Sequence, residues 1–390
     1  MLNIEKIRKD TLHCDDKIFL ASAGCSLPPK SIFEKMHAYN HLEEQFGGYP
    51  VEASAIDDRN SFYTEMAQLL NCKPDNISFQ YSATEGFSRA LSSIPFQKND
   101  VILTTDDDYI SNFIAFISLR KRFGIKIIRG NNLASGELDL IDFERKIINE
   151  KPVLVAITHV PTNSGLVQPV AKVGALCKKY DLLYLLDSCQ AVGQLEVNVQ
   201  AIGCDFLNGT GRKFLRGPRT SGFLYVSDKV LKMGLEPLFI DRRGAEWTND
   251  EEYTVENSAL RFEPKEIGVE IIGLAEAVKY CNAIGIKNIE NYNKTIAQKL
   301  RENLLQIPNI QLLDLGVQLS NIITFSVKNK SLEEVEKCLK SNHIYYSVSF
   351  KNYALIDFKK KNVDWAIRLS PHYFNTIEEI NRVGEILTTI

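Results

Sequence analysis

An acid and a lysine lie near each other along the chain, each beside an apolar run that is typical of a buried strand. Asp187 directly follows Leu182–Leu186, and Lys213 lies between two glycine-bearing turns ahead of Gly222–Val226. Such side chains at the ends of neighbouring strands can hold a pyridoxal phosphate ring, because its aldehyde needs a lysine for a Schiff base and its ring nitrogen needs a carboxylate. The stretch therefore predicts a pyridoxal phosphate site with Asp187 and Lys213 at its two ends.

Helical and strand patterns alternate through the first two-thirds of the sequence, which is typical of a largely parallel α/β sheet covered by helices. Three expected strands end in polar clusters, at Tyr109, Thr158 and Asp187. Ligands gather at the carboxyl ends of strands in open α/β sheets, so these clusters are expected to meet at one site. The expected strands are Ile77–Phe79, Val101–Thr104, Lys126–Arg129, Val153–Ile157, Leu182–Leu186 and Gly222–Val226.

The pattern changes after the last of these strands. Residues Asp241–Arg261 are polar and aromatic without a regular period, which predicts an irregular loop over the site. A long amphipathic helix from about Ile267 then begins a mixture of strands and helices, which predicts a smaller α+β domain. We expect a large cofactor-binding domain over 1–262, with its N-terminal segment packed on the small domain, and the small domain over 263–390.

Composition and charge exclude several classes of function. A formal net charge of −3 gives no basic field for nucleic acid, and no apolar run approaches the roughly 18–20 residues that cross a bilayer. The eight cysteines form no Cys-x-x-Cys pair, and the N-terminus has no apolar signal core, so we expect a cytoplasmic protein with reduced thiols. The acidic run Asp106–Asp108 is expected to be a solvated loop rather than a metal site, and no metal is predicted.

Two other interpretations of the lysine segment remain open. Arg212, Arg216 and Arg219 surround Lys213 and would suit a phosphate or nucleic-acid patch, but the segment lacks the spacing of a Walker A loop. A binding protein without catalytic activity on the same fold is the second alternative. A purified protein that is colourless, and unchanged when Lys213 is replaced, would favour it.

A set of motifs adds a resemblance to a known family. From about Phe19 to Leu387 the chain resembles the class V aminotransferases, which are fold type I pyridoxal 5'-phosphate (PLP) enzymes. Within that family it is most similar to the isopenicillin N epimerase-like and hercynylcysteine sulfoxide lyase-like branch, which is related to cysteine desulfurases. The motifs are Ala23-Gly24-Cys25-Ser26, Gly47-Gly48-Tyr49, Ser82-Ala83-Thr84-Glu85, Asp108-Tyr109-x-Ser111-Asn112, His159-Val160-Pro161-Thr162-Asn163, the segment 187–213, Gly244-Ala245-x-Trp247 and Arg368-x-Ser370-Pro371-His372-Tyr373-x-Asn375-Thr376.

The resemblance implies a fold and a set of cofactor contacts. The fold is a mostly parallel, seven-stranded type of sheet between helices, with a smaller C-terminal α+β domain. Lys213 would form the Schiff base and move the α-proton, Asp187 would pair with the ring nitrogen, and Tyr109 would stack on the ring. The remaining residues implied to hold the cofactor are Gln190 and Thr162 at the ring hydroxyl, and Ala83, Thr84, Thr210 and Arg212 at the phosphate.

The resemblance also implies a substrate and a partner. Arg368 would grip the carboxylate of a small amino-acid substrate with its bidentate fork, and Ala23, Gly24 and Tyr49 would line the substrate side. The family is homodimeric with the site at the interface, so Arg216 or the loop Asp241–Arg243 is expected to reach the partner subunit.

One departure from the family affects the reaction. Cysteine desulfurases carry a catalytic cysteine shortly before the carboxylate-binding arginine, whereas residues 350–365 contain none. Cys189 is expected to be buried packing beside Asp187. The expected activity is attack on an α-amino acid through an external aldimine and α-proton abstraction, ending in β-elimination by a carbon–sulfur lyase on a cysteine-type substrate. Transamination and epimerisation are the alternatives.

Overall fold

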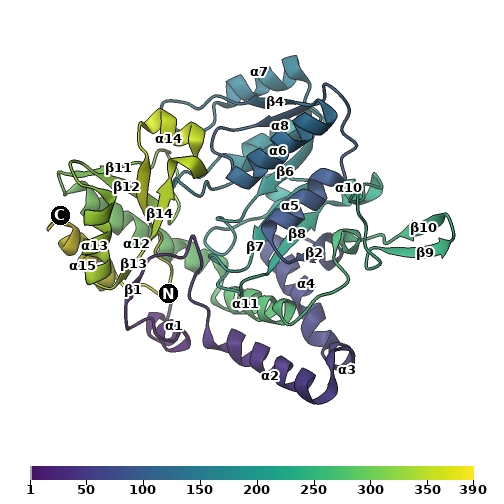
Figure 1. The fold of residues 1–390 in the computed structure, drawn as a ribbon, viewed down its shortest axis with the longest axis horizontal. Coiled ribbons are helices and arrows are strands. Elements are labelled where there is room, and N and C mark those ends of the chain that lie inside the picture. Colours follow the sequence, from purple (N-terminus) through teal and green to yellow (C-terminus); the bar gives the residue numbers. More distant parts are fainter. Residues whose placement is uncertain (1) are drawn as a thin grey trace.

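A seven-stranded sheet forms the centre of the larger part of the molecule (Figure 1). The computed structural model describes residues 2–390. The strand order is β2-β8-β7-β6-β5-β3-β4, and β8 runs antiparallel to both of its neighbours whereas the other pairs are parallel. The predicted mostly parallel sheet is therefore confirmed. Its strands are β2 (Ile77–Gln80), β3 (Val101–Thr104), β4 (Lys126–Arg129), β5 (Leu154–Thr158), β6 (Leu183–Asp187), β7 (Phe206–Thr210) and β8 (Gly222–Val226).

Alternate residues of these strands enter two different cores. Val155 and Ile157 pack into the cluster that holds α4 and α11, whereas Leu154 and Ala156 pack into the cluster that holds α5 and α6. This alternation follows from the two-residue period of a strand, and it explains why the strands are apolar on both faces. The covering helices are α4 (Ile56–Leu70), α5 (Ala83–Ser92), α6 (Ile110–Phe123), α7 (Leu140–Glu150), α8 (Val170–Lys179), α9 (Val199–Ile202), α10 (Asp228–Lys232) and α11 (Glu270–Ile284).

A second sheet follows with its own core. It is antiparallel throughout, in the order β11-β12-β15-β14, and packs against α12, α13 and α15. Its elements are β11 (Ile310–Leu312), β12 (Ile323–Val327), β14 (Ser347–Phe350), β15 (Trp365–Leu369), α12 (Ile286–Leu305), α13 (Leu332–Ser341), α14 (Leu355–Lys361) and α15 (Ile377–Leu387). The division at 262/263 stays a prediction, and α11, which lies beyond it, packs against α4.

The N-terminal segment joins this second sheet region. After α1 (Ile4–Asp10), the short strand β1 (Ile18–Phe19) pairs in parallel with β13 (Ile344–Tyr345). The ladder continues beyond β1, because the amide of Ser370 donates to the carbonyl of Leu20 and the amide of Ser22 donates to the carbonyl of Ser370. Residues from the two ends of the sequence therefore lie side by side.

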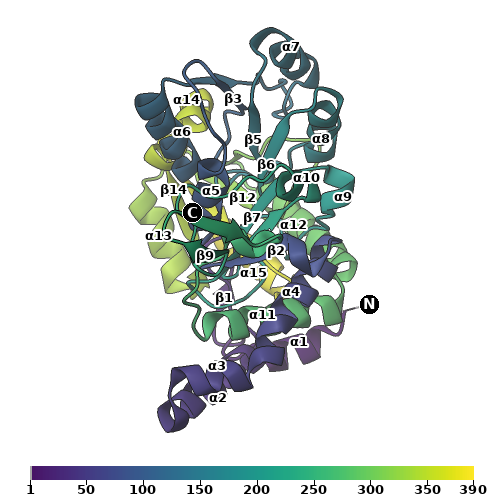
Figure 2. The ribbon, with the colours of Figure 1, turned by 90° about the vertical axis from the view of Figure 1, so that its right-hand side faces the viewer.

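Two pieces extend from the body. The helices α2 (Lys30–Phe46) and α3 (Gly48–Ser54) run along one side, and the hairpin of β9 (Ala245–Asn249) and β10 (Glu252–Val255) projects from another (Figures 1 and 2). The irregular loop predicted for Asp241–Arg261 is wrong, because Trp247 pairs with Tyr253 across two antiparallel strands. Within residues 2–390, no helix is both long and apolar enough to span a bilayer.

Candidate active site

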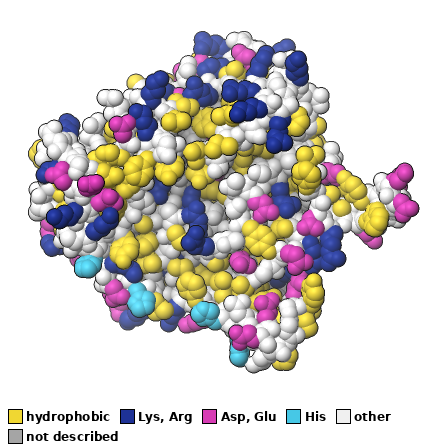
Figure 3. Space-filling view, in the orientation of Figure 1, with side chains coloured by type: hydrophobic (Ala, Val, Ile, Leu, Met, Phe, Trp, Pro, Cys, Tyr) yellow, Lys and Arg dark blue, Asp and Glu magenta, His cyan; other side chains and the backbone are white. Residues whose placement is uncertain are grey.

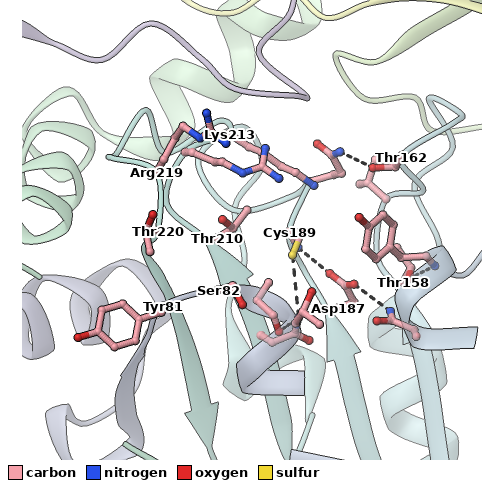
Figure 4. Close-up of a pocket in the computed structure, with 18 residues that line it drawn as sticks. Tyr81, Ser82, Thr158, Thr162, Asp187, Cys189, Thr210, Lys213, Arg219 and Thr220 are labelled. Atoms are coloured by element: carbon pink, nitrogen blue, oxygen red, sulfur yellow. Dashed lines mark hydrogen bonds between the residues drawn. The ribbon is translucent and has the colours of Figure 1, made fainter. Parts of the chain in front are cut away.

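A pocket of about 290 Å³ lies where β5, β6 and β7 end and α5 begins (Figure 4). This is the edge of the sheet at which open α/β folds bind ligands, so the prediction that the polar strand ends meet at one site is confirmed. The residues that line it are Tyr81, Ser82, Ala83, Thr84, Tyr109, Asn112, Thr158, Val160, Thr162, Asp187, Cys189, Gln190, Asn208, Thr210, Arg212, Lys213, Arg219 and Thr220.

Lys213 is a buried amine three residues beyond the end of β7. Its side chain is only 7% exposed. Burial lowers its pKa from the ordinary value, and the guanidinium of Arg212 acts in the same direction. A lower pKa increases the fraction of the neutral amine, which is the form that attacks a carbonyl and accepts a proton.

Asp187 lies at the floor of the pocket and is held in place by two donors. Asn112 Nδ2 donates to its Oδ2 at 2.9 Å, and the amide of Cys189 donates to its Oδ1 at 3.0 Å. The residue is 3% exposed, and its carboxylate keeps further lone pairs for a ligand. Asn112, which comes from α6, belongs to one of the family motifs, but no role in the site was predicted for it.

Asp108, which follows β3, connects the end of that strand to Thr158 at the end of β5. The hydroxyl of Thr158 donates to Asp108 at 2.5 Å, and the amide of Tyr109 lies 3.4 Å from the same hydroxyl. Burial raises the pKa of Asp108 to about 7. These contacts fix the loop that carries Tyr109, whose ring centroid lies 6.0 Å from Lys213 Nζ.

The acidic run 106–108 is not the solvated loop that we expected. Asp106 pairs with Arg129 at 2.7 Å and also with Lys360, whereas Asp107 accepts a hydrogen bond from Asn132 at 2.9 Å. The strand end turns these acids inward to different partners. In residues 2–390, no group of three or more His, Cys, Asp or Glu side chains is arranged to hold a metal ion.

The opposite wall offers an anion cradle at the N-terminus of α5. Ser82 caps this helix by accepting from the amide of Glu85 at 3.1 Å, and the amides of the first turn have no intrahelical partner. A Cβ on Gly222 would lie 3.1 Å from Ala83 N, so the start of β8 approaches this turn closely. Thr220 beside it has a φ of 59°, which is strained for a β-branched residue.

Gln190 connects the floor to the N-terminal segment. Its Nε2 donates to Thr162 Oγ1 at 2.6 Å and to the carbonyl of Ala23 at 3.0 Å. Its buried Oε1 has no hydrogen-bond partner among residues 2–390 and is free to face a ligand. Ala23 is fixed in turn, because its amide donates to Ser370 Oγ at 2.9 Å.

Arg368, from β15, is not among the residues that line the pocket but lies beside it, next to Thr162, at the end that we call the mouth. Its Nη1 donates to the carbonyl of Thr162 at 2.9 Å, and its side chain forms no ion pair with any described residue. The buried Nε also has no partner in the part of the chain that the structure describes. Burial lowers its pKa to about 10, with a further contribution from Arg212. A buried cation with an unused donor is suited to bind an anion.

Three predicted residues lie elsewhere than expected. Arg216 is fully buried between Tyr373 and Phe374, with its guanidinium carbon 4.9 and 4.8 Å from the two ring centroids, so the prediction that it reaches a partner is wrong. Tyr49 is 73% exposed on α3 and does not line the pocket of its own chain. Cys189 lines the pocket rather than serving only as packing, and burial raises its pKa well above the usual value.

No role in the site was predicted for Asn112, Asn208 or Thr220. Asn208 interrupts the apolar pattern of β7, the one strand of the large sheet that was not predicted, and its Nδ2 donates to the carbonyl of Ala83 at 3.3 Å. A buried asparagine inside a strand is the signal that would have identified both the strand and the site.

Comparison with known proteins agrees with this geometry. The sequence model of the family described as "Aminotransferase class-V" matches residues 18–383. A protein of Methanothermobacter thermautotrophicus named "Probable cysteine desulfurase" is 27% identical over 402 residues, which cover 100% of this chain and 98% of that protein.

Solved structures extend the comparison to the fold. The apo cysteine desulfurase of Thermococcus onnurineus is 25% identical, has a TM-score of 0.91, and the match covers 100% of this chain and 98% of that one. The protein C-DES, solved with glycine covalently linked to its PLP cofactor, has a TM-score of 0.85 at 20% identity, with 98% of each chain covered. At that identity the likeness to C-DES shows the fold alone.

Proposed function

Because the chain belongs to the aminotransferase class-V family of PLP-dependent, fold type I enzymes, we propose that it cleaves the carbon–sulfur bond of a cysteine-type amino acid by β-elimination. One observation carries the proposal. A buried lysine with a lowered pKa lines the same pocket as a hydrogen-bonded carboxylate, and a buried, unpaired arginine lies at the mouth.

The pocket residues fit PLP. Asp187 offers a carboxylate to a ring nitrogen, the unpartnered Gln190 Oε1 faces a polar ligand, and the first turn of α5 with Thr84 and Thr210 offers donors to a phosphate. Tyr109 lines the same pocket as Lys213 and offers an aromatic ring that would stack on the cofactor. When bound, PLP supplies an electron sink that makes the α-proton of an amino acid acidic.

The chain's own residues then carry the reaction. Arg368 binds the α-carboxylate and orients the Cα–H bond, while the neutral amine of Lys213 takes the α-proton. As that proton leaves, its electron pair forms the Cα–Cβ double bond and the Cβ–S bond breaks, so that the sulfur leaves as a thiolate and takes a proton back from the Lys213 ammonium to become a thiol. The remaining three-carbon fragment is hydrolysed to pyruvate and ammonia.

The segment before Arg368 supports elimination over transfer of sulfur to the enzyme. Residues 350–365, which include α14, contain no cysteine. Cys338 lies on α13 and is half-buried. The relatives named as cysteine desulfurases support the cysteine-type substrate, and C-DES has also been solved as a "cystine C-S lyase" with its product cysteine persulfide. Transamination and epimerisation are the competing outcomes.

The proposal is tested with the purified holoenzyme. We expect a visible absorbance from the bound cofactor, which borohydride fixes on Lys213, and pyruvate as the product from cysteine conjugates. Lys213→Ala should lose both the fixed label and the pyruvate. A colourless protein that takes up no PLP would overturn the proposal, whereas turnover to a keto acid or an inverted amino acid would replace elimination with one of the alternatives.

We also propose a homodimer. Large apolar side chains are exposed on α2 and α3 and near the hairpin, and hydrophobic side chains gather across the face shown in Figure 3. Burial of such side chains favours association. Sedimentation should give twice the mass of the chain. The exposed side chains are Phe33, Leu42, Phe46, Tyr49, Ile56, Leu238, Phe239 and Trp247.

Three finer points belong to the same proposal. The N-terminal Ala23-Gly24-Cys25-Ser26 and the Gly244-Ala245-x-Trp247 motif support the isopenicillin N epimerase-like and hercynylcysteine sulfoxide lyase-like branch. The eight cysteines, which are all free thiols, support a cytoplasmic location. The separate core of the second sheet supports a small C-terminal domain, and its buried residues beyond the large sheet begin at Ile296 of α12, whereas α11 belongs to the core of the large sheet.

A further inference from the structure

We propose that Arg212 acts with Arg368 to select amino acids whose side chain ends in an acidic group. The inference rests on the proposed function, because it names the substrate class of the same site. It assigns Arg212 to the substrate, whereas the family resemblance implies a contact with the cofactor phosphate.

The two arginines converge on Gly24. Arg212 Nη1 donates to the carbonyl of Gly24. A Cβ built on Gly24 would lie 3.5 Å from Arg368 Nη2 and 3.3 Å from the carbonyl of Ala21, so a side chain there would crowd the mouth. The two guanidiniums therefore flank a single glycine, and each lies near enough to the other for Arg212 to lower the pKa of Arg368.

No carboxylate of the chain neutralises this pair. Among residues 2–390, neither Arg212 nor Arg368 takes part in an ion pair within 4 Å. The acid that lines the pocket, Asp187, is occupied at the floor by Asn112. Two like charges, one buried on Arg368 and one half-buried on Arg212, are unfavourable side by side until anions bind them.

The positive groups can be matched to anions in turn. Arg219 and Thr220 line the pocket together and suit the phosphate, and Arg368 suits the α-carboxylate. The contact with Gly24 directs Arg212 to the side of Arg368. Arg212 is then the cation that remains, and a second acid on the substrate is the group that would bind it.

The inference is tested with two isosteric cysteine conjugates. S-carboxymethyl-L-cysteine carries a side-chain carboxylate, and S-carboxamidomethyl-L-cysteine carries a neutral amide in its place. For the wild-type holoenzyme we expect kcat/KM for pyruvate formation to favour the acid by tenfold or more, because hydrogen bonds to charged groups are the strong ones. Arg212→Gln should remove the preference, and Arg212→Lys should restore part of it.

A second measurement separates this inference from the proposed function. L-Glutamate and L-glutamine are bound to the holoenzyme and detected by the change in cofactor absorbance, which needs no carbon–sulfur cleavage. The wild type should bind glutamate at least tenfold more tightly than glutamine. In Arg212→Gln the two dissociation constants should be similar. If the wild type prefers glutamate but forms no pyruvate from cysteine conjugates, the inference about Arg212 holds and the lyase proposal fails.

The PLP affinity gives the outcome that overturns the inference. Titration of the apoprotein with PLP should give similar dissociation constants for the wild type and Arg212→Gln, whereas Arg219→Gln should weaken PLP binding. If Arg212→Gln instead weakens PLP binding and leaves the ratio between acidic and neutral ligands unchanged, Arg212 holds the phosphate. Equal binding of both ligands by the wild type would also overturn the inference.

Discussion

The charged groups at the floor and at the mouth of the pocket differ in whether the protein itself supplies their partners. At the floor, Asp187 receives hydrogen bonds from Asn112 and from the amide of Cys189. At the mouth, Arg368 keeps an unused Nε and has no carboxylate partner among residues 2–390. A group that is already fixed is suited to a resident cofactor, whereas a buried charge left unpaired is suited to a substrate that comes and goes.

The largest effect should follow from removing the charge at the floor. Asp187→Asn keeps the size of the side chain but offers no carboxylate to the ring nitrogen. We expect kcat to fall by about 10²- to 10³-fold, the range typical of losing one group that stabilises charge in the transition state. The measurement is the steady-state rate together with the absorbance of the bound cofactor. A variant with wild-type kcat would show that the floor does not control the reaction.

A smaller effect is expected at the mouth, and mostly on substrate binding. Arg368→Gln removes the charge that would hold the α-carboxylate, so KM should rise by about 10- to 100-fold. Arg368→Lys keeps the charge without the planar fork, so its KM should lie between those of the wild type and Arg368→Gln. Titration with PLP should give an unchanged dissociation constant. A loss of PLP affinity equal to that of a floor variant would erase the distinction between the two ends.

The support of the floor can be tested without touching its charge. Asn112→Ala removes a donor from a buried carboxylate, which should cost about 1–3 kcal/mol in the free energy of unfolding. Asn208→Ala is a matched control, because its Nδ2 donates to the carbonyl of Ala83 instead of to Asp187. The measurement is denaturant unfolding of the apoprotein. Equal losses in the two variants would mean that the contact with Asp187 has no special weight.

The smallest expected effect is a pH dependence of the free energy of unfolding that comes from Asp108. Burial raises the pKa of Asp108 to about 7, above the about 3.9 of an unfolded aspartate. The folded chain therefore keeps a proton that the unfolded chain has released, and the stability from this group is lost as pH rises through about 7. Asp108→Asn should lose less free energy of unfolding between pH 5 and 8 than the wild type, by about 1 kcal/mol or more.

Asp107, which is present in the wild type and in Asp108→Asn, is an internal control for this prediction. Asp107 also has a pKa that burial raises, to about 6. Its titration contributes to the wild type and the variant alike and so cancels in the difference. Parallel stability curves for the two proteins would contradict the assigned role of Asp108.

The two ends of the pocket also differed in how far the sequence could predict them. Asp187 follows an apolar run, and such a run marks a strand end directly, whereas Lys213 was predicted from the glycine-bearing turns around it although β7, the strand before it, was missed. Arg216 was misjudged because the rings that lie over it come from distant parts of the sequence, Tyr280 on α11 and the pair Tyr373 and Phe374. Asn112 gives no local signal, since one asparagine in a helix looks the same whether it faces solvent or a carboxylate.

The hairpin of β9 and β10 is a second case that a local sequence pattern did not predict. Trp247 and Tyr253 suggested a covering loop because the stretch is polar and aromatic. The cross-strand pairing that makes it a hairpin depends on a turn at residues 250–251 that interrupts the alternation. Whether such a segment lies over a site depends on which way it leaves the body, and no short pattern encodes that direction.

The pairing of the N-terminal segment with the residues around Ser370 has a consequence for synthesis on the ribosome. Ala23, whose carbonyl holds Gln190, is itself held by Ser370 Oγ. A chain grows from its N-terminus and folds as it emerges. The mouth of the pocket therefore stays unfinished until residue 370 has emerged, so a product that stops after Lys213 but before Arg368 would carry the lysine and lack both the arginine and the serine that holds Ala23.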